Sequence, residues 1–320
     1  MPFFNLFTII LISSTIIIAA DVIKGIWFDR IVLIIFENTN GSVTYADPYF
    51  QELTKRPQGV YLSEFYAVEH PSEPNYIAQI AGSTYGILDD NNYDIDATTL
   101  VDLLENKSIS WKGYMEDYPE NCFLNATSRP YARKHNPFFS FTTITKNATR
   151  CAKVVNGSRL DDDIANYEVP QVVYYVPNLN NDAHDNNITF ASSWFKNWFE
   201  PKLQKPSFTD NTLFFITFDE NDNDNDTVNH IYSALYGTPV KNNTDHNDTT
   251  HYSHYSYLRT VEDNWNLGSL GRNDSNAIAF TKYLIQSSSS SGTSYTIKNS
   301  IHSHNLWIPF ILLLYIVIKN

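Results

Sequence analysis

Four side chains suited to binding a cation come directly after two apolar stretches of the chain. Glu37 and Asn38 follow the first stretch, and Asp219 and Glu220 follow the second. Three carboxylates that lie together repel one another and raise each other's pKa unless a divalent cation neutralises them. We therefore predict that these four residues form a metal site. The competing interpretation is that they are solvated acids in surface loops.

Other residue types that bind metals gather in a short polar segment, where Asp182, His184 and Asp185 stand close together. His254 offers a further imidazole, although His251 in the same HYSHYS segment competes with it. Mixed histidine and carboxylate ligands suit zinc, manganese or iron, whereas oxygen ligands alone suit calcium or magnesium. The sequence thus predicts a divalent metal ion and leaves its identity open.

A candidate nucleophile is Ser72, which precedes Pro74, Asn75 and the apolar segment Tyr76–Ala81. Proline favours the first turn of a helix, so Ser72 is expected near a helix N-terminus. The free backbone N–H groups and the positive end of the helix dipole favour phosphate there. The commoner role of a serine at this position is a helix cap, and the local residues leave both roles open.

Apolar runs rich in β-branched and aromatic residues predict the strands that position these side chains. Three runs are clear and a fourth is weaker: Ile31–Phe36, Val172–Val176, Leu213–Phe218 and Val60–Val68. Helical patterns lie between and after them: Thr98–Asn106 with an N-cap at Asp96, Ala191–Leu203 and His254–Leu267. This alternation predicts an α/β domain with a mostly parallel central sheet flanked by helices. Ligands bind beyond the carboxyl ends of such strands, and polar residues follow all four runs.

The net charge of −13 excludes two classes of partner. Nucleic acid and anionic lipid are both repelled by an acidic surface. The partners expected here are small phosphorylated substrates; these are anions too, so the protein must concentrate positive charge locally, most simply with bound metal ions. A membrane contact is expected only through a lipid anchor. The oligomeric state does not follow from the sequence.

Both ends of the chain look like targeting segments. Residues 1–20 are almost entirely apolar and predict a signal peptide, against the alternative of a buried N-terminal strand. Residues 286–305 form a Ser-rich polar spacer, and 306–320 form a hydrophobic tail too short to span a bilayer. This order predicts a GPI anchor attached near Ser291, with a tail-anchored membrane protein as the alternative. Residues 21–285 are left as one catalytic domain.

Glycosylation sequons and the cysteines agree with a secreted or cell-surface location. Cys122 and Cys151 are the only two cysteines, and in an oxidising compartment they most simply form a disulfide. The N-x-S/T sequence occurs at ten asparagines: Asn40, Asn106, Asn125, Asn147, Asn156, Asn187, Asn225, Asn242, Asn247 and Asn273.

Several blocks of the chain resemble the fungal secreted acid phosphatases of the phosphoesterase family, which also includes bacterial acid phosphatases and phospholipases C. Through that family the chain resembles the alkaline phosphatase superfamily. The blocks occur in the family's order: FDRIVLIIFENTN (28–40), HPSEPNYIAQIAG (70–82), VDLLENKSISWKGYMED (101–117), YARKHNPF (131–138), VPNLNNDAHDNNITFA (176–191), FFITFDEN (214–221) and HYSHYSYLRTVEDNWNLGSLGRND (251–274).

The resemblance implies roles for individual residues. It makes Ser72 the nucleophile, gives Asn75 a phosphate oxygen to bind, and assigns Asp185 to the metal site with Glu37, Asn38, Asp219 and Glu220. His70 and His184 become candidates for proton transfer, and four further residues are expected to contact the substrate: Lys134, His135, Asp182 and His254. One departure follows Glu220, where family members have a shorter loop and then an arginine, and this chain has Asn229-His230.

The expected activity is a metal-dependent acid phosphatase that hydrolyses phosphate monoesters through a phosphoserine at Ser72, with His184 or His70 protonating the leaving alcohol. A phosphodiesterase or phospholipase C would use the same nucleophile and metal. A catalytically silent surface glycoprotein is the alternative outside the enzymes.

Overall fold

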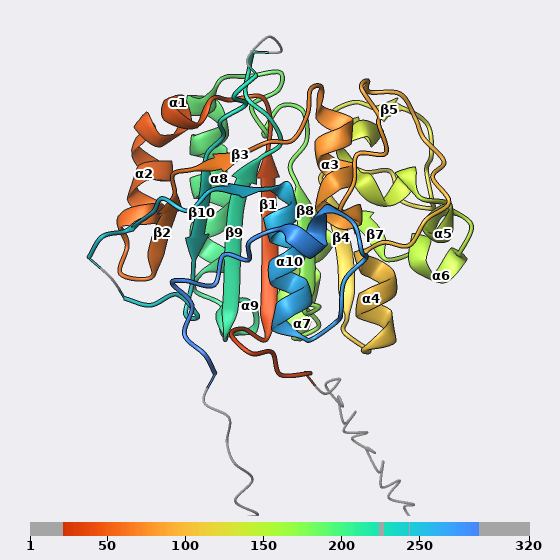
Figure 1. Ribbon diagram of the computed structural model, residues 1–320. Helices are drawn as coiled ribbons and strands as arrows, with labels where there is room; N and C mark the ends of the chain where they lie inside the picture. The colour runs from red at the N-terminus through yellow and green to blue at the C-terminus, as the bar shows by residue number, and fades with distance from the viewer. Residues whose placement is uncertain (1–21, 224–226, 243, 288–320) are drawn as a thin grey trace, which may run out of the picture. The chain divides into compact units, whose positions relative to one another are not determined.

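The computed structural model describes residues 22–223, 227–242 and 244–287 of the chain (Figure 1). The predicted signal peptide, residues 288–305 of the spacer, the hydrophobic tail, Ser291 and the sequon at Asn225 lie outside these residues. Within the described residues, no helix combines the length and the hydropathy needed to cross a bilayer.

An eight-stranded sheet forms the centre of the domain (Figure 1). Its strands stand in the order β11 (Asn247–Asp248), β2 (Gly59–Leu62), β10 (Ser233–Tyr236), β9 (Thr212–Phe218), β1 (Arg30–Phe36), β8 (Val172–Val176), β4 (Trp111–Met115) and β7 (Val154–Asn156). All neighbours pair in parallel except β10, which is antiparallel to both β9 and β2. The predicted α/β class with a mostly parallel sheet is confirmed.

Ten α-helices are described around the sheet: α1 (Gly41–Ala46), α2 (Pro48–Lys55), α3 (Ser72–Ala81), α4 (Leu100–Asn106), α5 (Thr142–Thr145), α6 (Ala148–Cys151), α7 (Arg159–Asn166), α8 (Ile188–Lys202), α9 (Pro206–Thr209) and α10 (His254–Asn264). Short 3-10 turns occur at η1 (Arg133–His135), η2 (Pro137–Ser140) and η3 (Asn273–Asn276). Two small sheets pair β3 (Phe65–Tyr66) with β12 (Tyr252–Ser253), and β5 (Thr127–Ser128) with β6 (Tyr131–Ala132).

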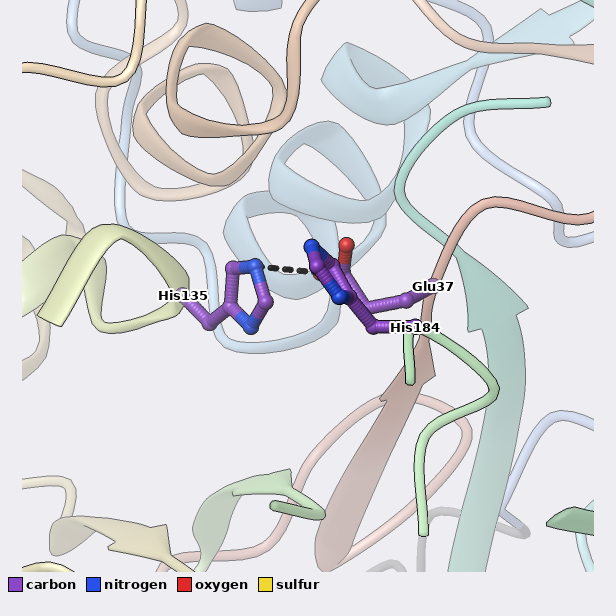
Figure 2. A group of neighbouring side chains, drawn as sticks. All are labelled: Glu37, His135 and His184. Carbon is purple, nitrogen blue, oxygen red and sulfur yellow. Dashed lines mark ion pairs between the residues drawn. The ribbon is translucent and has the colours of Figure 1, made fainter. Parts of the chain in front are cut away.

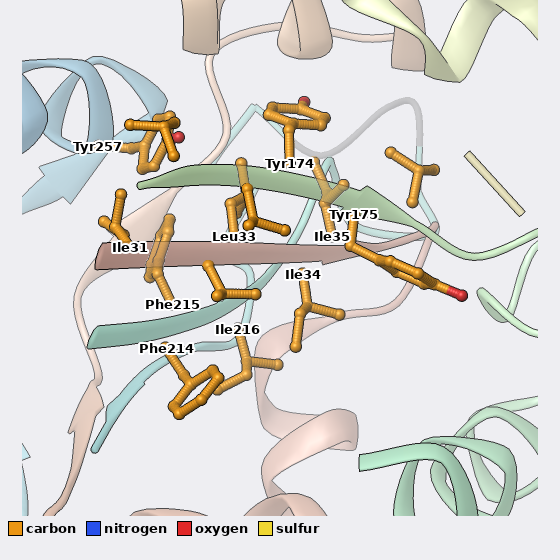
Figure 3. Close-up of a cluster of buried hydrophobic side chains, with 14 of the residues drawn as sticks. Ile31, Leu33, Ile34, Ile35, Tyr174, Tyr175, Phe214, Phe215, Ile216 and Tyr257 are labelled. Atoms are coloured by element: carbon orange, nitrogen blue, oxygen red, sulfur yellow. The ribbon is translucent and has the colours of Figure 1, made fainter. Parts of the chain in front are cut away.

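Successive residues of the central strands pack against opposite layers of helices. In β9, Phe214 contacts Phe199 of α8, whereas Phe215 stacks on Tyr257 of α10. Figure 1 shows α10 in front of the sheet and α8 behind it, and Figure 3 shows Phe215 on the face of Tyr257 and Phe214 on the opposite face. Residues 31–36 of β1 are fully buried, as expected for a strand covered on both sides.

Most of the predicted strands are close to the observed ones. Three strands match to within one residue: β1, β8 and β9. The predicted strand Val60–Val68 is instead divided between β2 in the main sheet and β3 in a small one. The remaining strands are short and were not predicted: β4, β7, β10 and β11 in the main sheet, and β5, β6 and β12 in the small ones.

The helix predicted behind Asp96 begins later, at Leu100. Thr99 is its N-cap, because its hydroxyl accepts the Val101 N–H at 3.2 Å and the Asp102 carboxylate accepts the Thr99 N–H at 2.8 Å. Asp96 instead accepts a hydrogen bond from the Thr142 hydroxyl. The prediction of Asp96 as the cap was therefore wrong.

The other two predicted helices differ at their ends. The helix expected at Ala191–Leu203 begins three residues earlier, because the Asn187 side chain accepts the Phe190 N–H and caps it. The helix expected to reach Leu267 ends at Asn264.

Candidate active site

The carboxyl ends of β1 and β9 bring the two predicted metal-binding pairs together. The Asp219 N–H donates to the Phe36 carbonyl at 3.0 Å, and the Asn38 N–H donates to Asp219 Oδ1 at 3.1 Å. The loop after β8 joins them, since the Glu37 N–H donates to the Asp182 carbonyl at 2.8 Å. Parallel strands therefore supply the convergence that the polar strand ends indicated.

Ser72 is the first residue of α3, and its hydroxyl points at carboxylates. Its Oγ lies 3.1 Å from Glu37 Oε2 and 3.0 Å from Glu220 Oε1, so its single hydrogen is shared between two acceptors. Pro71 holds the N-cap position and makes no side-chain cap hydrogen bond. The alternative role of Ser72 as a helix cap is therefore wrong, and its oxygen lies at the N-terminal end of α3.

Asn75 holds the loop before the nucleophile in place. Its Oδ1 accepts the N–H groups of Val68 and Glu69 at 3.0 and 3.1 Å. Its Nδ2 donates to the carbonyls of Glu69 and Pro71 at 2.7 and 3.1 Å. Both hydrogens of the amide are used, so this arrangement does not match the predicted bond from Asn75 to a phosphate oxygen.

Burial raises the proton affinity of the central carboxylates. Glu37, Asp182 and Asp219 are all 0% exposed. Burial, and after it the charge of Asp219, raises the pKa of Glu37 well above its ordinary value, while burial raises the pKa of Asp219 to about 6. Burial likewise raises the pKa of Asp182 well above the ordinary range. A divalent cation offsets such repulsion more effectively than protons do.

Several buried polar atoms in this group have no hydrogen-bond partner among the described residues: Asn38 Oδ1, Asp182 Oδ2, Asp219 Oδ2 and His135 Nε2. A buried polar atom without a partner costs about 1–3 kcal/mol. Three oxygens and one imidazole nitrogen are donors that a divalent cation accepts. The residues present therefore fit a divalent metal ion.

His135 and His184 bring imidazoles to Glu37 from two other segments (Figure 2). One potential ligand atom from each of the three residues lies within 4.8 Å of the others. His135 Nε2 lies 3.3 Å from Glu37 Oε1, and His135 Nδ1 lies 3.6 Å from Asp182 Oδ2. Burial, and then the charge of Lys134, lowers the pKa of His135 well below its ordinary value. His135 is thus a neutral imidazole beside two carboxylates. The local sequence around His135, KHN (134–136), did not indicate this position.

Asp185 lies at the edge of the site and is engaged in ion pairs. Its Oδ1 lies 2.9 Å from His184 Nδ1, and its Oδ2 accepts from Arg129 at 2.7 Å. Burial by itself favours a higher pKa for Asp185. The hydrogen bond from His184 and the charge of Arg129 outweigh burial and lower the pKa of Asp185. Asp185 therefore stands apart from the buried carboxylates, which does not match its predicted metal role, whereas Asp182 lies among them.

Lys134 brings a positive charge to the same edge. Its Nζ lies 3.4 Å from His184 Nε2 and donates to Asp90 Oδ2 at 2.8 Å. Burial disfavours the ammonium ion, but the nearby charges of Glu37 and Asp90 outweigh it and raise the pKa of Lys134. Lys134 is therefore a charged donor beside His184.

His70 lies next to Glu220. Its Nδ1 contacts Glu220 Oε2, while the other oxygen of this carboxylate accepts from Ser72. A continuous chain of contacts thus leads from the Ser72 hydroxyl through Glu220 to an imidazole.

His254 lies behind the site, where it holds Asp219. Its Nε2 lies 2.6 Å from the Asp219 carbonyl, which only accepts, so Nε2 carries the hydrogen. Burial lowers the pKa of His254 to about 4, so the ring is neutral and Nδ1 accepts from Gln79 Nε2 at 3.1 Å. Both nitrogens are used, which does not match the predicted contact with substrate. His251 is exposed and stacks on Tyr66.

Asn229 and His230, which stand where family members have an arginine, bond to the backbone. Asn229 donates to the Glu69 carbonyl at 2.8 Å and accepts the Asn221 N–H at 2.9 Å. His230 Nε2 lies 2.9 Å from the Ser63 carbonyl. These residues join the loops around the site, and Asn229 brings no positive charge to it.

Several known proteins are similar to this chain in sequence. The chain is 39% identical over 265 residues to an acid phosphatase of Aspergillus fumigatus, covering 80% of this chain and 59% of that protein. It is 36% identical over 266 residues to a phosphate-repressible acid phosphatase of Penicillium chrysogenum, covering 80% and 63%. A phosphatidylinositol-3-phosphatase of Mycobacterium tuberculosis is 29% identical over 261 residues, covering 76% and 79%. The chain thus spans about three fifths of the length of these fungal relatives.

Solved structures share the fold at low sequence identity. A protein of the alkaline phosphatase superfamily from Vibrio parahaemolyticus has a TM-score of 0.55 at 12% identity, covering 81% of this chain and 72% of that one. The lipoteichoic acid synthase LtaP from Listeria monocytogenes has a TM-score of 0.53 at 8% identity, covering 78% and 76%. Residues 54–268 match the Phosphoesterase family, and this match covers most of the described domain. The chain therefore belongs to the phosphoesterase family.

Proposed function

We propose that this protein is a metal-dependent acid phosphatase that transfers the phosphoryl group of a monoester to Ser72 and then to water. The observation that carries the proposal is the Ser72 hydroxyl, which lies at the first turn of α3 within 3.1 Å of two buried carboxylates. The names of the fungal relatives support this reaction class.

Glu37, Asn38, Asp219 and Glu220 are the proposed cation ligands. The buried, unpartnered oxygens of Asn38 and Asp219 support this choice. Asp182 and His135 replace Asp185 as candidates for completing the set, because they face the same buried group. A divalent cation bound here supplies positive charge that stabilises the serine oxygen and the phosphoryl oxygens.

The residues of the chain account for the movement of protons and of the phosphoryl group. Ser72 Oγ forms a bond to phosphorus as its proton passes to Glu220, and the bond from phosphorus to the leaving alkoxide breaks. His184 donates a proton to that alkoxide, with Lys134 beside it on the phosphoryl oxygens. Water then attacks the phosphorus of the phosphoserine as one of its protons passes to His184. The bond from phosphorus to Ser72 Oγ breaks, Ser72 Oγ regains its proton from Glu220, and inorganic phosphate leaves.

Turnover of two chromogenic esters tests the reaction class. We expect hydrolysis of p-nitrophenyl phosphate with an optimum below neutral pH, little hydrolysis of bis-p-nitrophenyl phosphate, and loss of activity on chelation that added metal restores. Preference for the diester would instead indicate a phosphodiesterase or phospholipase C. Activity that survives exhaustive metal removal would contradict the cation site, and inactivity towards both esters would favour a silent glycoprotein.

Substitution of the nucleophile tests the covalent step. We expect Ser72→Ala to lower kcat about 10³-fold or more, because the reaction loses its acceptor oxygen. Ser193→Ala on the exposed side of α8 is the matched control and should retain wild-type turnover. Acid quenching with ³²P-labelled substrate should place the label on Ser72. Turnover of Ser72→Ala within tenfold of wild type would exclude this mechanism.

We also propose that the protein is a glycosylated, secreted or GPI-anchored protein of the cell surface. Nine of its sequons fall in the described residues; seven of these asparagines are exposed and two, Asn40 and Asn156, are half-buried. The disulfide Cys122–Cys151 is formed, as oxidising compartments permit. A mobility shift with an N-glycosidase and release from cells by a phosphatidylinositol-specific phospholipase C test these two features separately.

A further inference from the structure

Asp90 lies in the connection between α3 and α4, and its two carboxylate oxygens bond to two different parts of the site. Oδ1 accepts the N–H of Glu73 at 2.9 Å, and Glu73 follows Ser72 directly. Oδ2 accepts from Lys134 Nζ at 2.8 Å. One carboxylate therefore links the first turn of the nucleophile helix to a cationic side chain from a distant segment.

The segment that carries Asp90 is held against the segment that carries Lys134. Arg133 Nη2 donates to the Tyr93 carbonyl at 3.2 Å. Farther along, the Ile95 N–H donates to the Ser140 carbonyl at 2.8 Å. These bonds come from residues on both sides of Lys134, so the position of the Asp90 carboxylate relative to the Lys134 backbone is fixed.

A lysine side chain needs such a partner to hold one direction. Its ammonium ends a flexible four-carbon stem, and fixing that stem in one direction costs rotamer entropy. In this structure the Lys134 ammonium lies 3.4 Å from His184 Nε2, at the edge of the carboxylate group. Asp90 is the carboxylate that accepts from it.

Two other acids close to Asp90 in the fold, Asp89 and Glu73, bond to partners other than Lys134. Asp89 accepts from the Tyr93 hydroxyl at 2.6 Å and from the Asn91 N–H at 3.0 Å, away from Lys134. The Glu73 carboxylate accepts from the Ser140 hydroxyl at 2.5 Å. Asp90 thus differs from the adjacent Asp89 in its contacts and not in its chemistry.

We infer that Asp90 is a positioning residue for phosphoryl transfer, which holds the Lys134 ammonium beside His184 and ties it to the first turn of α3. Lys134 then meets the phosphoryl oxygens while the helix that carries Ser72 presents the nucleophile. Asp90 acts through Lys134 and contacts no substrate atom. The inference rests on the proposed function.

Substitution in the full-length protein tests this role. We expect Asp90→Asn to lower kcat/KM for p-nitrophenyl phosphate at least tenfold and to weaken inhibition by inorganic phosphate, because the ammonium loses its charged partner. Asp89→Asn is the matched control and should stay within twofold of wild type on both measurements. The inference is overturned if Asp90→Asn lowers kcat/KM less than threefold. It is also overturned if Asp89→Asn lowers kcat/KM by as much as Asp90→Asn does.

A double-mutant cycle with Lys134→Met separates positioning from a general effect on folding. We expect Asp90→Asn to change kcat/KM less than threefold once Lys134 is absent. A loss above threefold in that background overturns the inference. Thermal unfolding is measured for each variant, and Asp90→Ser takes the place of Asp90→Asn in the cycle if the latter does not fold.

Wild type and Ser72→Ala are assayed alongside. Equal turnover by these two proteins refutes the proposed function itself. Turnover that depends on Ser72, together with a cycle that fails the criteria above, refutes only the role of Asp90.

Discussion

Buried acids decide the chemistry around the Ser72 hydroxyl. Glu37 and Asp219 are fully buried, and burial raises the pKa of both carboxyl groups. In the absence of a cation they therefore hold protons more tightly than exposed acids do. Any metal ion that binds them displaces those protons, so its affinity rises with pH.

The partners of a side chain, more than its type, determine its place in the site. Ser72, Asn75 and His254 are all polar residues of the family blocks. Ser72 alone directs its polar atom at the carboxylates, while Asn75 and His254 bond to the backbone that carries the site. The resemblance to the family implied a role for all three, and only the hydrogen bonds distinguish these roles.

The contact from His254 to Asp219 leads to a prediction about metal affinity. We expect His254→Gln to weaken metal binding about 10–100-fold, because the imidazole fixes the backbone of a proposed ligand. His251→Gln is the matched control, since His251 is exposed and only stacks on Tyr66. Isothermal titration of the metal into each variant measures the effect. Equal affinities for the two variants would contradict the role of His254.

At the scale of elements, the site is assembled from the ends of strands and from one long loop. The ends of β1, β8 and β9 bring the acids together. The loop between Cys122 and Cys151 brings Lys134 and His135, and the disulfide closes this loop across 29 residues. The strand ends therefore position the acids of the site, and the disulfide-closed loop positions Lys134 and His135.

Removal of the disulfide is predicted to affect stability and substrate binding together. A loop of this length restricts the unfolded chain by roughly 3 kcal/mol. We expect the double variant Cys122→Ser/Cys151→Ser to unfold at lower temperature and to show a raised KM, because the loop that carries Lys134 is less restrained. Calorimetry and steady-state kinetics measure both. An unchanged KM with lowered stability would show that the other contacts of the loop suffice to hold Lys134.

How far the sequence could predict these elements depends on how each one is buried. β1, β8 and β9 consist mainly of apolar residues and were predicted within a residue. β4 contains Lys112 and Gly113, so its pattern does not stand out, although it pairs with β8 along five residues. The loop contacts of Asp90 and His135 join segments that are distant in the chain, and no local pattern carries that information.

At the scale of the whole molecule, acidic residues outnumber basic ones by 35 to 22. Lys134 and Arg129 therefore place positive charge at the edge of the site in an acidic protein, and the proposed phosphorylated substrate needs such local charge. The same excess of acids places carboxyl groups in the interior away from the site. Glu262 of α10 is 1% exposed, and its carboxylate oxygens have no hydrogen-bond partner among the described residues.

Glu262 predicts how stability depends on pH. Burial, and then the charge of Asp274, raises the pKa of Glu262 from 4.5 to about 9. The folded state therefore binds more protons than the unfolded state between these two values, and stability falls as pH rises through this window. We expect Glu262→Gln to remove this loss, so that the variant gains on the order of 4 kcal/mol over wild type between about pH 5 and pH 8.5.

Denaturant unfolding at the two pH values measures this gain. Asp263→Asn is the neighbouring control, because Asp263 pairs with Arg259 at the surface of α10. Its stability should follow wild type at both pH values. If the free energies of unfolding of Glu262→Gln and wild type differ by the same amount at both pH values, the raised pKa of Glu262 is refuted.

The place of β1 in the sheet has a consequence for biosynthesis. This central strand pairs only with β8 and β9 among the described strands, and β8 begins at Val172, 136 residues after Phe36 (172 minus 36). At about 5–20 residues per second, a ribosome needs roughly 7–27 s to supply the first partner. Throughout that interval the nascent chain displays an unpaired run of isoleucine, valine, leucine and phenylalanine, the kind of segment that self-associates and that chaperones recognise. We therefore expect expression yield to depend on protection of this segment before translation reaches β8.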